Sequence, residues 1–360
     1  QDHSHILTDS RAKAAIISTK KLAERFLQAS HQSAHIEFVV SLEELGREQR
    51  LSHELFHWDT FLSFSEKTAF DPVQNLPILN ENQCACIIYT SGTGGMPKGV
   101  MLSHRSMLHN CKGAALILQD FGLENEVFLS FLPLSHAYEH TVGLIFPIYL
   151  GAEIYYAQSL ESLTTNMQEC RPTIMTAVPR LYEMIRHKIN ANLAKSPEYR
   201  QKLFMKALSL GKARLLGEKL NFVEHMQNLL LNKLVRKKIQ NRFGGRLKAM
   251  VSGGGPLNAE VGLYFRALGI PILQGYGQTE SGPVISVNPP QKVKIQSVGK
   301  ALANTDLKIA PDGEILVRGD LVMNGYWQNE KATEAAIKDG WLHTGDIEHL
   351  DKDQYLYITE

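Results

Sequence analysis

The sequence predicts an α/β protein in which mostly parallel sheets are flanked by helices. Strand-like and helix-like segments alternate from about residue 84 to about residue 285, which favours parallel pairing of the strands. From residue 297 onward, short alternating runs are bounded by turn signals such as Pro311-Asp312-Gly313, and these indicate a small β-rich subdomain. With 360 residues, 44% of them hydrophobic, the chain can bury a substantial core.

The same changes of pattern predict how the chain divides. We expect a partial α/β subdomain over residues 1–83, a central α/β subdomain over 84–296 and the β-rich subdomain over 297–360. In the central part, short apolar runs predict strands at 84–90, 127–132, 154–156, 174–176 and 247–251. Ser103 is the expected N-cap of a helix that runs through Ala115, and Pro179 opens a helical tract. Residues 181–247 of this tract contain few breakers and predict two or three amphipathic helices.

Charge and cysteine content exclude several classes of protein. There are 38 Lys and Arg residues against 37 Asp and Glu residues, so the chain has no bias toward nucleic acid. Four cysteines do not form a disulfide framework and favour a reducing cytoplasm, and we expect Cys84 and Cys86 to be small side chains on one face of a buried strand. No apolar run approaches the ~20 residues that cross a bilayer. Gln1 stands where an initiator Met is expected, which indicates a trimmed chain.

A glycine-rich segment, YTSGTGGMPKGV at residues 89–100, has the composition of a phosphate-binding loop. Glycines let backbone amides approach phosphate oxygens, while nearby hydroxyl groups and the Lys98 ammonium group add donors and charge. The segment differs from the GxxxxGK[ST] loop, because Pro97 precedes the lysine and Gly99 follows it. By composition alone, a flexible surface loop is an equally good interpretation.

Three further segments carry groups that suit a nucleotide. GYGQTE at 275–280 supplies a ring for a purine, a hydroxyl for a phosphate and a carboxylate for Mg²⁺, although it also fits an ordinary turn at a strand end. SGGGPL at 252–257 leaves space for a ligand, or is a strand-to-helix turn capped near Asn258. WLHTGDI at 341–347 offers Asp346, which suits ribose hydroxyls but also forms turns.

Together these motifs resemble the adenylate-forming (AMP-binding) superfamily of acyl-CoA synthetases, luciferases and peptide-synthetase adenylation domains. Segment 89–100 is similar to the Tyr-Thr-Ser-Gly-Thr-Thr-Gly-x-Pro-Lys-Gly signature, with Gly94 where the family has a second Thr. The resemblance covers residues 84–360 in the family's order, and the run HILTDSRAKAAIIS looks like the middle of a family subdomain. It implies a large N-terminal domain that begins inside the fold and lacks the C-terminal domain.

The resemblance also implies roles for individual residues. It implies a mobile loop that holds the β- and γ-phosphates of ATP, made of Thr90, Ser91, Gly92, Thr93, Gly95 and Lys98. Tyr276 would contact adenine, Thr279 the α-phosphate, Glu280 the Mg²⁺ ion and Asp346 the ribose. The segment PLSHAYEHT at 133–141 is similar to the family loop whose His lies near the acyl carboxylate, which makes His136 the candidate. The remaining implied nucleotide-site residues are Gly253, Gly254, Gly255, Gln274, Gly275 and Gly277.

The implied activity is that of a long-chain fatty-acid CoA ligase that uses ATP, Mg²⁺ and CoA. VPRLYEMI and GGRLKAMVSGGGPL are more similar to bacterial-type long-chain ligases than to short-chain or aryl ligases. The tract 181–247 holds about fifteen Lys and Arg residues against about four Asp and Glu residues. It is interpreted either as a solvated basic face or as a surface that attracts an anionic membrane. We therefore expect a cytoplasmic enzyme with peripheral association at the inner face of the membrane.

Family members continue beyond the Tyr-Leu-x-Ile stretch into a Gly-Arg-x-Lys-Asp hinge and a C-terminal domain, whereas this sequence stops at Glu360. We expect the 360-residue chain to bind nucleotide, to adenylate poorly and not to complete thioester formation. One alternative is an acyl-AMP ligase that loads an acyl carrier protein. Another is a non-catalytic nucleotide-binding regulatory homologue, which Gly94 favours and which the presence of Glu280 and Asp346 opposes.

Overall fold

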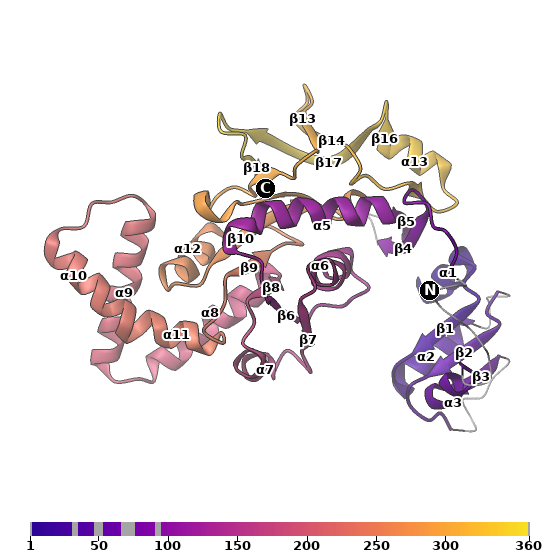
Figure 1. The fold of residues 1–360 in the computed structure, drawn as a ribbon, viewed down its shortest axis with the longest axis horizontal. Coiled ribbons are helices and arrows are strands. Elements are labelled where there is room, and N and C mark those ends of the chain that lie inside the picture. Colours follow the sequence, from indigo (N-terminus) through magenta and orange to yellow (C-terminus); the bar gives the residue numbers. More distant parts are fainter. Residues whose placement is uncertain (1, 31–34, 47–52, 66–75, 91–94, 359–360) are drawn as a thin grey trace. The chain divides into compact units, whose positions relative to one another are not determined.

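A computed structural model describes residues 2–30, 35–46, 53–65, 76–90 and 95–358, and the chain forms two compact units (Figure 1). The first unit comprises Gln1–His104 and Asn324–Thr333, and the second comprises Arg105–Met323 and Glu334–Glu360. The three-part division expected at residues 84 and 297 remains a prediction. The boundaries of the two compact units differ from the predicted ones, because the strand Cys84–Thr90 belongs to the first unit and not to a central subdomain.

The first unit contains a parallel three-stranded sheet with helices packed against it. The strands are β1 (Ala14–Ile17), β2 (Phe38–Ser41) and β3 (Glu54–His57), paired in that order. The helices are α1 (Asp2–Ser10), α2 (Lys20–Ser30) and α3 (Trp58–Ser63). Ala23 and Leu27, one turn apart on α2, are both buried, and Ala23 packs with Ile17 and Val39. This small core is the hydrophobic support of the unit.

A second sheet of the first unit is antiparallel and corrects two expectations. Strand β4 (Cys84–Thr90) forms as predicted, but it pairs antiparallel with β5 (Lys98–Ser103), whose other neighbour is β15 (Gly325–Tyr326). It therefore does not belong to the parallel sheet. The expectation that Cys84 and Cys86 share one face of a buried strand is also wrong. Cys84 is exposed and Cys86 is half-buried, because an irregularity in the pairing between them disrupts the start of the strand.

The second unit is built on a seven-stranded sheet, and its main part is parallel as predicted. The parallel neighbours are β7 (Glu153–Tyr156), β6 (Val127–Ser130), β8 (Ile174–Ala177), β9 (Ala249–Ser252) and β10 (Ile272–Gly277). The edge is completed by the antiparallel strands β11 (Val284–Val287) and β12 (Lys300–Ala301). All residues of β6, β8 and β9 are buried, which explains their continuous apolar sequences.

Helices lie against both faces of this sheet. Helix α5 (His104–Leu118) follows Ser103 as predicted, and a 3₁₀ turn, Gln119–Phe121, extends it. The π-helix Glu139–Ile145 continues into α6 (Phe146–Leu150), and α7 (Leu163–Cys170) lies between β7 and β8. Helix α12 (Ala259–Ala267) begins at Asn258, whose side chain accepts a hydrogen bond from the backbone N–H of Glu260, so the predicted cap is confirmed.

The helical tract contains more helices than the two or three predicted. It consists of α8 (Pro179–Ala194), α9 (Glu198–Leu215), α10 (Phe222–Leu231), the π-helix Asn232–Arg236 and α11 (Lys237–Arg242). Pro197 separates α8 from α9, and Gly217, with φ of +79°, lies in the turn after α9. Asn221 and Glu224 then form a capping box that begins α10. Local breakers and caps thus divide what the composition presents as one continuous tract.

The C-terminal part is rich in strands, as predicted, and these strands pair antiparallel. Its sheet contains β13 (Asp306–Ile309), β14 (Glu314–Arg318), β16 (Ile337–Lys338), β17 (Trp341–Leu350) and β18 (Leu356–Ile358). The short helices α13 (Glu330–Ala336), Thr279–Ser281 and Pro290–Lys292 complete the described elements of this region. The buried side chains Ile315, Val317 and Leu356 pack with Ile285 of β11, which joins the small sheet to the large one.

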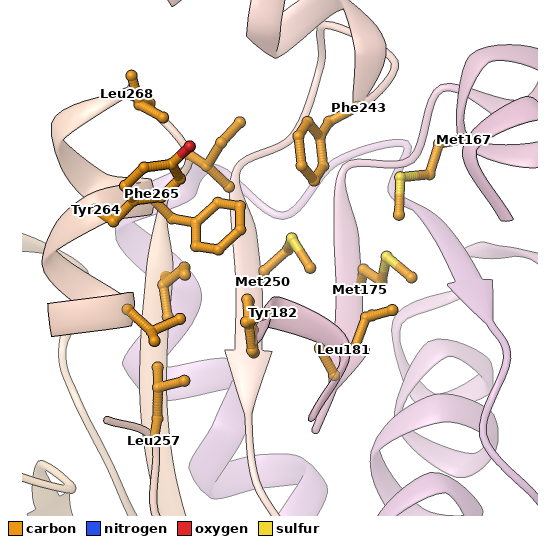
Figure 2. Packing of buried hydrophobic residues seen from close by; sticks show 14 of the residues in the cluster. Met167, Met175, Leu181, Tyr182, Phe243, Met250, Leu257, Tyr264, Phe265 and Leu268 are labelled. Carbon is orange, nitrogen blue, oxygen red and sulfur yellow. The ribbon is translucent and has the colours of Figure 1, made fainter. Parts of the chain in front are cut away.

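Aromatic side chains dominate the core on one face of the large sheet (Figure 2). Phe265 of α12 is fully buried, and its ring makes edge contacts with Tyr182, Phe243 and Tyr264 at centroid distances of 5.7, 6.5 and 5.3 Å. Figure 2 shows Met250 of β9 below this aromatic group. The cluster therefore fixes α12 on the sheet.

Replacing Phe265 with Ala is expected to lower the free energy of unfolding by about 3–5 kcal/mol, because it leaves a cavity among rings that cannot collapse into it. Urea denaturation measures the change. Phe222→Ala, at a position that is 80% exposed, is the matched control and should change stability by less than about 0.5 kcal/mol. Equal effects of the two substitutions would contradict the assignment of Phe265 to the core.

Candidate active site

A pocket of the second unit lies on the other face of the sheet. It holds about 760 Å³ of space, part of it open to solvent, and extends from Ile174 in β8 to the carboxyl ends of β9 and β10. In open α/β sheets these ends are the usual place for ligands. Of the residues predicted for the site, seven line this pocket: His136, Gly253, Gly254, Gly275, Tyr276, Gly277 and Thr279.

The walls of the pocket are apolar and its mouth is polar. Helix α5, the π-helix with α6, and strands β8, β9 and β11 contribute the apolar side chains, which are Ala114, Leu118, Val142, Phe146, Ile174, Val251, Val284 and Val287. The polar groups come from His136, Tyr276, Gln278 and Thr279. This arrangement fits a ligand with a hydrophobic body and a polar end.

Two glycines are required by close approaches at the rim of the pocket. A Cβ atom on Gly253 would lie 2.9 Å from Cζ of Tyr138, whose ring is buried and whose hydroxyl donates to the carbonyl oxygen of Val251. A Cβ atom on Gly277 would lie 1.9 Å from the carbonyl oxygen of Pro283. Glycine at these positions keeps the turns after β9 and β10 open.

Tyr276 and Asp346, which lie in separate sequence motifs, meet in the structure. The Tyr276 hydroxyl donates to Oδ2 of Asp346 over 2.5 Å. Burial, and then this hydrogen bond, raise the pKa of Tyr276 well above its ordinary value. The backbone N–H of Asp346 also donates to the hydroxyl of Thr344. The ring is thereby held in one orientation at the pocket wall, which suits stacking on a planar base.

The turn that carries Thr279 and Glu280 is fixed from inside the protein. The side-chain amide of Asn110 on α5 donates to the carbonyl oxygen of Ser281 at 3.2 Å and accepts from the backbone N–H of Val284 at 2.6 Å. Thr279 reaches the pocket, whereas Glu280 is not among the lining residues. Asn110 is buried and was missed by the sequence analysis, because a single Asn inside a helix carries no pattern.

Glu280 offers one carboxylate for a magnesium ion, and its role as a metal ligand remains a prediction. Among residues 2–30, 35–46, 53–65, 76–90 and 95–358, no group of three or more His, Cys, Asp and Glu side chains is arranged to hold a metal. Mg²⁺ is commonly held by one or two carboxylates together with phosphate oxygens and water.

His136 lies at the exposed mouth of the pocket. Its Nδ1 accepts a hydrogen bond from the backbone N–H of Tyr138 at 3.2 Å. Since Nδ1 is the acceptor, the neutral ring carries its proton on Nε2. That proton is then available to a carboxylate or phosphate oxygen at the pocket mouth.

Glu139, directly after the pocket residues Ala137 and Tyr138, was also missed by the sequence analysis. Its carboxylate is fully buried and accepts hydrogen bonds of 2.5 Å from the hydroxyls of Ser130 on β6 and Thr176 on β8. Burial raises the pKa of Glu139, and the two hydroxyl hydrogen bonds counteract part of this shift. Glu139 thus ties the start of the π-helix to two strands. An acidic residue shortly before the apolar run at residues 142–150 is the signal that could have identified it.

Gln274 and Gly255 do not line the pocket either. Gln274 is buried in β10, and its side-chain amide donates to the carbonyl oxygen of Ile295 over 2.5 Å. Gly255 is exposed in the turn before α12.

The predicted phosphate-loop residues belong to the first unit. Thr90 ends β4 and Lys98 begins β5, and the two are paired across the sheet, so the expectation that both lie in a loop is wrong. The antiparallel pairing of β4 with β5 includes the last residue of β4 and the first residue of β5. Lys98 is exposed, with Nζ 4.8 Å from the ring centroid of Tyr326, and Gly95 is exposed as well. Ser91, Gly92 and Thr93 lie outside the described residues.

Gly253→Ala is expected to weaken ligand binding to the pocket and to destabilise the fold by about 1–3 kcal/mol, because the new methyl group would displace the Tyr138 ring. Gly255→Ala is the matched control, since its methyl group would only reach Pro179 at an ordinary distance of 3.8 Å. Nucleotide titration and urea denaturation measure both effects. Similar results for the two variants would show that the Gly253–Tyr138 contact does not shape the pocket.

Sequence comparison identifies relatives over most of the chain. Residues 1–327 match the family described as AMP-binding enzyme. The long-chain-fatty-acid–CoA ligase FadD15 of Mycobacterium bovis is 33% identical over 296 residues, which are 80% of this chain and 49% of the relative. The long-chain-fatty-acid–CoA ligase ACSBG2 of Gallus gallus is 33% identical over 347 residues, or 92% of this chain and 45% of the relative. The chain therefore spans about half the length of these curated relatives.

Solved structures share the fold at lower sequence identity. The anthranilate CoA ligase AuaEII, solved with anthranoyl-AMP, matches with a TM-score of 0.71 and 20% identity over 99% of this chain and 60% of that one. The N-terminal domain of FACL13 from Mycobacterium tuberculosis matches with a TM-score of 0.69 and 20% identity over 100% of this chain and 77% of that one. The fold and the family match agree with each other. The chain belongs to the AMP-binding enzyme family and has the α/β fold of an adenylate-forming N-terminal domain.

Proposed function

We propose that the protein to which this chain belongs activates a long-chain fatty acid with ATP and transfers the acyl group to CoA. The observation that carries the proposal is the pocket, whose apolar walls end at a mouth formed by His136, Tyr276 and Thr279. A fatty acid has the same division between a hydrophobic chain and a single polar group. Relatives that are 33% identical are named long-chain-fatty-acid–CoA ligases, which supports this substrate class.

The nucleotide would bind at the polar mouth. The ring of Tyr276, oriented by Asp346, would stack on adenine, and the second oxygen of Asp346 would accept from a ribose hydroxyl. Thr279 would donate to the α-phosphate, and Glu280 would help to hold Mg²⁺. From the sequence motif, the exposed Lys98 ammonium group would neutralise charge on the β- and γ-phosphates, and the Thr90 hydroxyl would donate a hydrogen bond to a phosphate oxygen. Magnesium supplies further charge neutralisation on the phosphates when bound.

The proposed reaction has two steps. A carboxylate oxygen of the fatty acid attacks the α-phosphorus of ATP, the bond from that phosphorus to the bridging oxygen breaks, and pyrophosphate leaves with the bonding electrons. The CoA sulfur then attacks the acyl carbon, AMP leaves, and the thiol proton passes to solvent. The protein groups act by positioning the reactants and by stabilising negative charge. His136, with its proton on Nε2, would hold a carboxylate oxygen in line with the α-phosphorus.

We further propose that this is a cytoplasmic enzyme that associates peripherally with the inner face of the membrane. No helix among the described residues is both long and apolar enough to cross a bilayer. Long-chain fatty acids partition into membranes, so an enzyme that uses them gains from a position at the lipid surface. The basic helical tract favours attraction to anionic lipids.

ATP–pyrophosphate exchange by the full-length protein, measured with carboxylates of increasing chain length, is expected to be greatest with long chains. Glu280→Gln, which removes the charge and keeps the shape, should reduce the exchange rate by about 100-fold, because a metal-binding charge is lost where negative charge develops. Removal of Mg²⁺ with a chelator should abolish exchange in both proteins. ATP binding without exchange for any carboxylate would favour a regulatory nucleotide-binding protein instead.

The pocket walls should determine the preferred chain length. Ala114→Leu adds a branched side chain to the pocket, so it is expected to lower kcat/KM for long chains by about 10-fold and to leave octanoate nearly unaffected. Ala115→Leu, at a half-buried position on the same helix that does not line the pocket, is the control. An equal loss for short and long chains would argue against this pocket as the acyl site.

The acyl acceptor is tested separately with the same full-length protein. Thioester formation with CoA is the expected outcome. Transfer only to an acyl carrier protein would replace the proposed second step and leave the first step unchanged.

A further inference from the structure

Helix α10 presents its apolar face to solvent. Its large apolar side chains have exposed fractions between 51% and 80%, and they occupy the positions i, i+1, i+4, i+7 and i+8: Phe222, Val223, Met226, Leu229 and Leu230. This spacing places all five on one arc of the helix. We refer to these five residues as the α10 stripe. The buried residues of the helix are Asn228 and Leu231, so the usual orientation of a surface helix is reversed.

Lysines flank helix α10 in the sequence on both sides. Lys219 precedes the helix, and Lys233, Lys237 and Lys238 follow it, and all four are exposed. None of these four lysines forms a salt bridge with any residue that the structure describes. Lys233 lies four positions after Leu229 and extends the same arc. Figure 1 shows α9 and α10 at the outer end of the second unit, apart from the strands β6–β10.

A second feature, an arginine pocket, adjoins the α10 stripe. Arg214 of α9, Arg236 of the π-helix and Arg266 of α12 line a space of about 720 Å³, part of it open to solvent, together with Asn228 and Asn232. No acidic side chain is among its lining residues. Leu229 belongs both to this lining and to the α10 stripe, so the two features share an edge.

Within the described part of the chain, no acidic side chain forms a salt bridge with the guanidinium groups of this pocket. Arg236 is 6% exposed and donates only to carbonyl oxygens, those of Ala207, Asn228 and Ala267. Burial, and then the charge of Arg214, lower its pKa. Nε of Arg266 is buried and has no hydrogen-bond partner, although its NH1 donates to the carbonyl oxygen of Ile272. Buried cations without a counter-charge are costly, and a planar guanidinium suits phosphate oxygens.

We propose that the α10 stripe and the arginine pocket together form a docking surface for an anionic phospholipid bilayer. The α10 stripe inserts at the boundary between headgroups and acyl chains, and the arginine pocket receives the phosphate of one headgroup. Charge complementarity selects this occupant, because about fifteen Lys and Arg residues against about four Asp and Glu residues lie within 181–247. The inference rests on the proposed function, whose substrate partitions into bilayers.

Flotation of the full-length protein with vesicles tests the α10 stripe. Binding is expected with phosphatidylcholine vesicles that contain phosphatidylglycerol, to be much weaker with phosphatidylcholine alone, and to fall in about 0.5 M salt. The double variant Phe222→Ser with Met226→Ser should bind at least about 10-fold more weakly. Ile148→Ser, at a position of the second unit that is 61% exposed, is the matched control and should bind normally.

The arginine pocket is tested by a pair of substitutions on one helix. Arg214→Gln and Lys206→Gln each remove one positive charge from an exposed position on α9, but only Arg214 lines the pocket. We expect Arg214→Gln to weaken vesicle binding by about 10-fold and Lys206→Gln by less than about twofold. A different result would overturn the lipid proposal. If free inorganic phosphate binds the arginine pocket and the α10 stripe variant does not weaken vesicle binding, the pocket is a site for a soluble anion.

Two other outcomes would overturn the proposal. One is vesicle binding that is unchanged in the double variant. The other is a concentration-dependent dimer that the double variant abolishes while vesicle binding stays normal, since a second copy of the chain would then be the occupant. ATP–pyrophosphate exchange with octanoate, a soluble substrate, should be unaffected in all variants. Failure of exchange in the unmodified protein with intact vesicle binding would contradict the proposed function alone.

Discussion

The parallel pairing of β8, β9 and β10 is the constraint on which the rest of the second unit depends. It aligns the carboxyl ends of β9 and β10, so that the glycine-rich turns after them lie at one edge of the sheet. The strands are buried on both faces, and successive residues point to opposite sides. Met250 therefore packs in the aromatic core under α12, while the next residue, Val251, lines the pocket. The sheet therefore separates the aromatic core from the pocket.

The site is shaped by buried groups, two of which, Glu139 and Asn110, do not line the pocket. Glu139 holds the π-helix against β6 and β8, and Asn110 holds the turn that carries Thr279. Tyr138, fixed by its hydrogen bond to Val251, forms a wall that only glycine at position 253 can accommodate. Buried polar groups with satisfied hydrogen bonds orient a site more strictly than apolar packing does. The geometry of the pocket mouth thus depends on residues from four different segments.

Under the proposed function, the pocket would bind the acyl chain of a lipid substrate and the helical tract would contact the membrane that contains it. The pocket offers an enclosed apolar surface for one acyl chain, whereas α10 leaves its apolar residues at the surface. Exposed apolar patches with a polar rim are characteristic of interaction surfaces. If both proposals hold, the α10 stripe and the pocket in the same compact unit would allow a substrate to be taken directly from a bilayer.

Local sequence determined the α/β class, the strands of the parallel sheet, the Asn258 cap and the four motifs, because each depends on periodicity or on residue types at short spacing. It could not determine that β4 pairs antiparallel with β5, because the short apolar run of β4 fits a strand in either direction of pairing. The contact of Tyr276 with Asp346 joins residues 70 positions apart and exists only through the packing of the small sheet on the large one. Periodicity likewise predicted amphipathic helices in the tract. Only the tertiary structure decided that α10 turns its apolar side outward, because Asn228 and Leu231 occupy the side that packs against the protein.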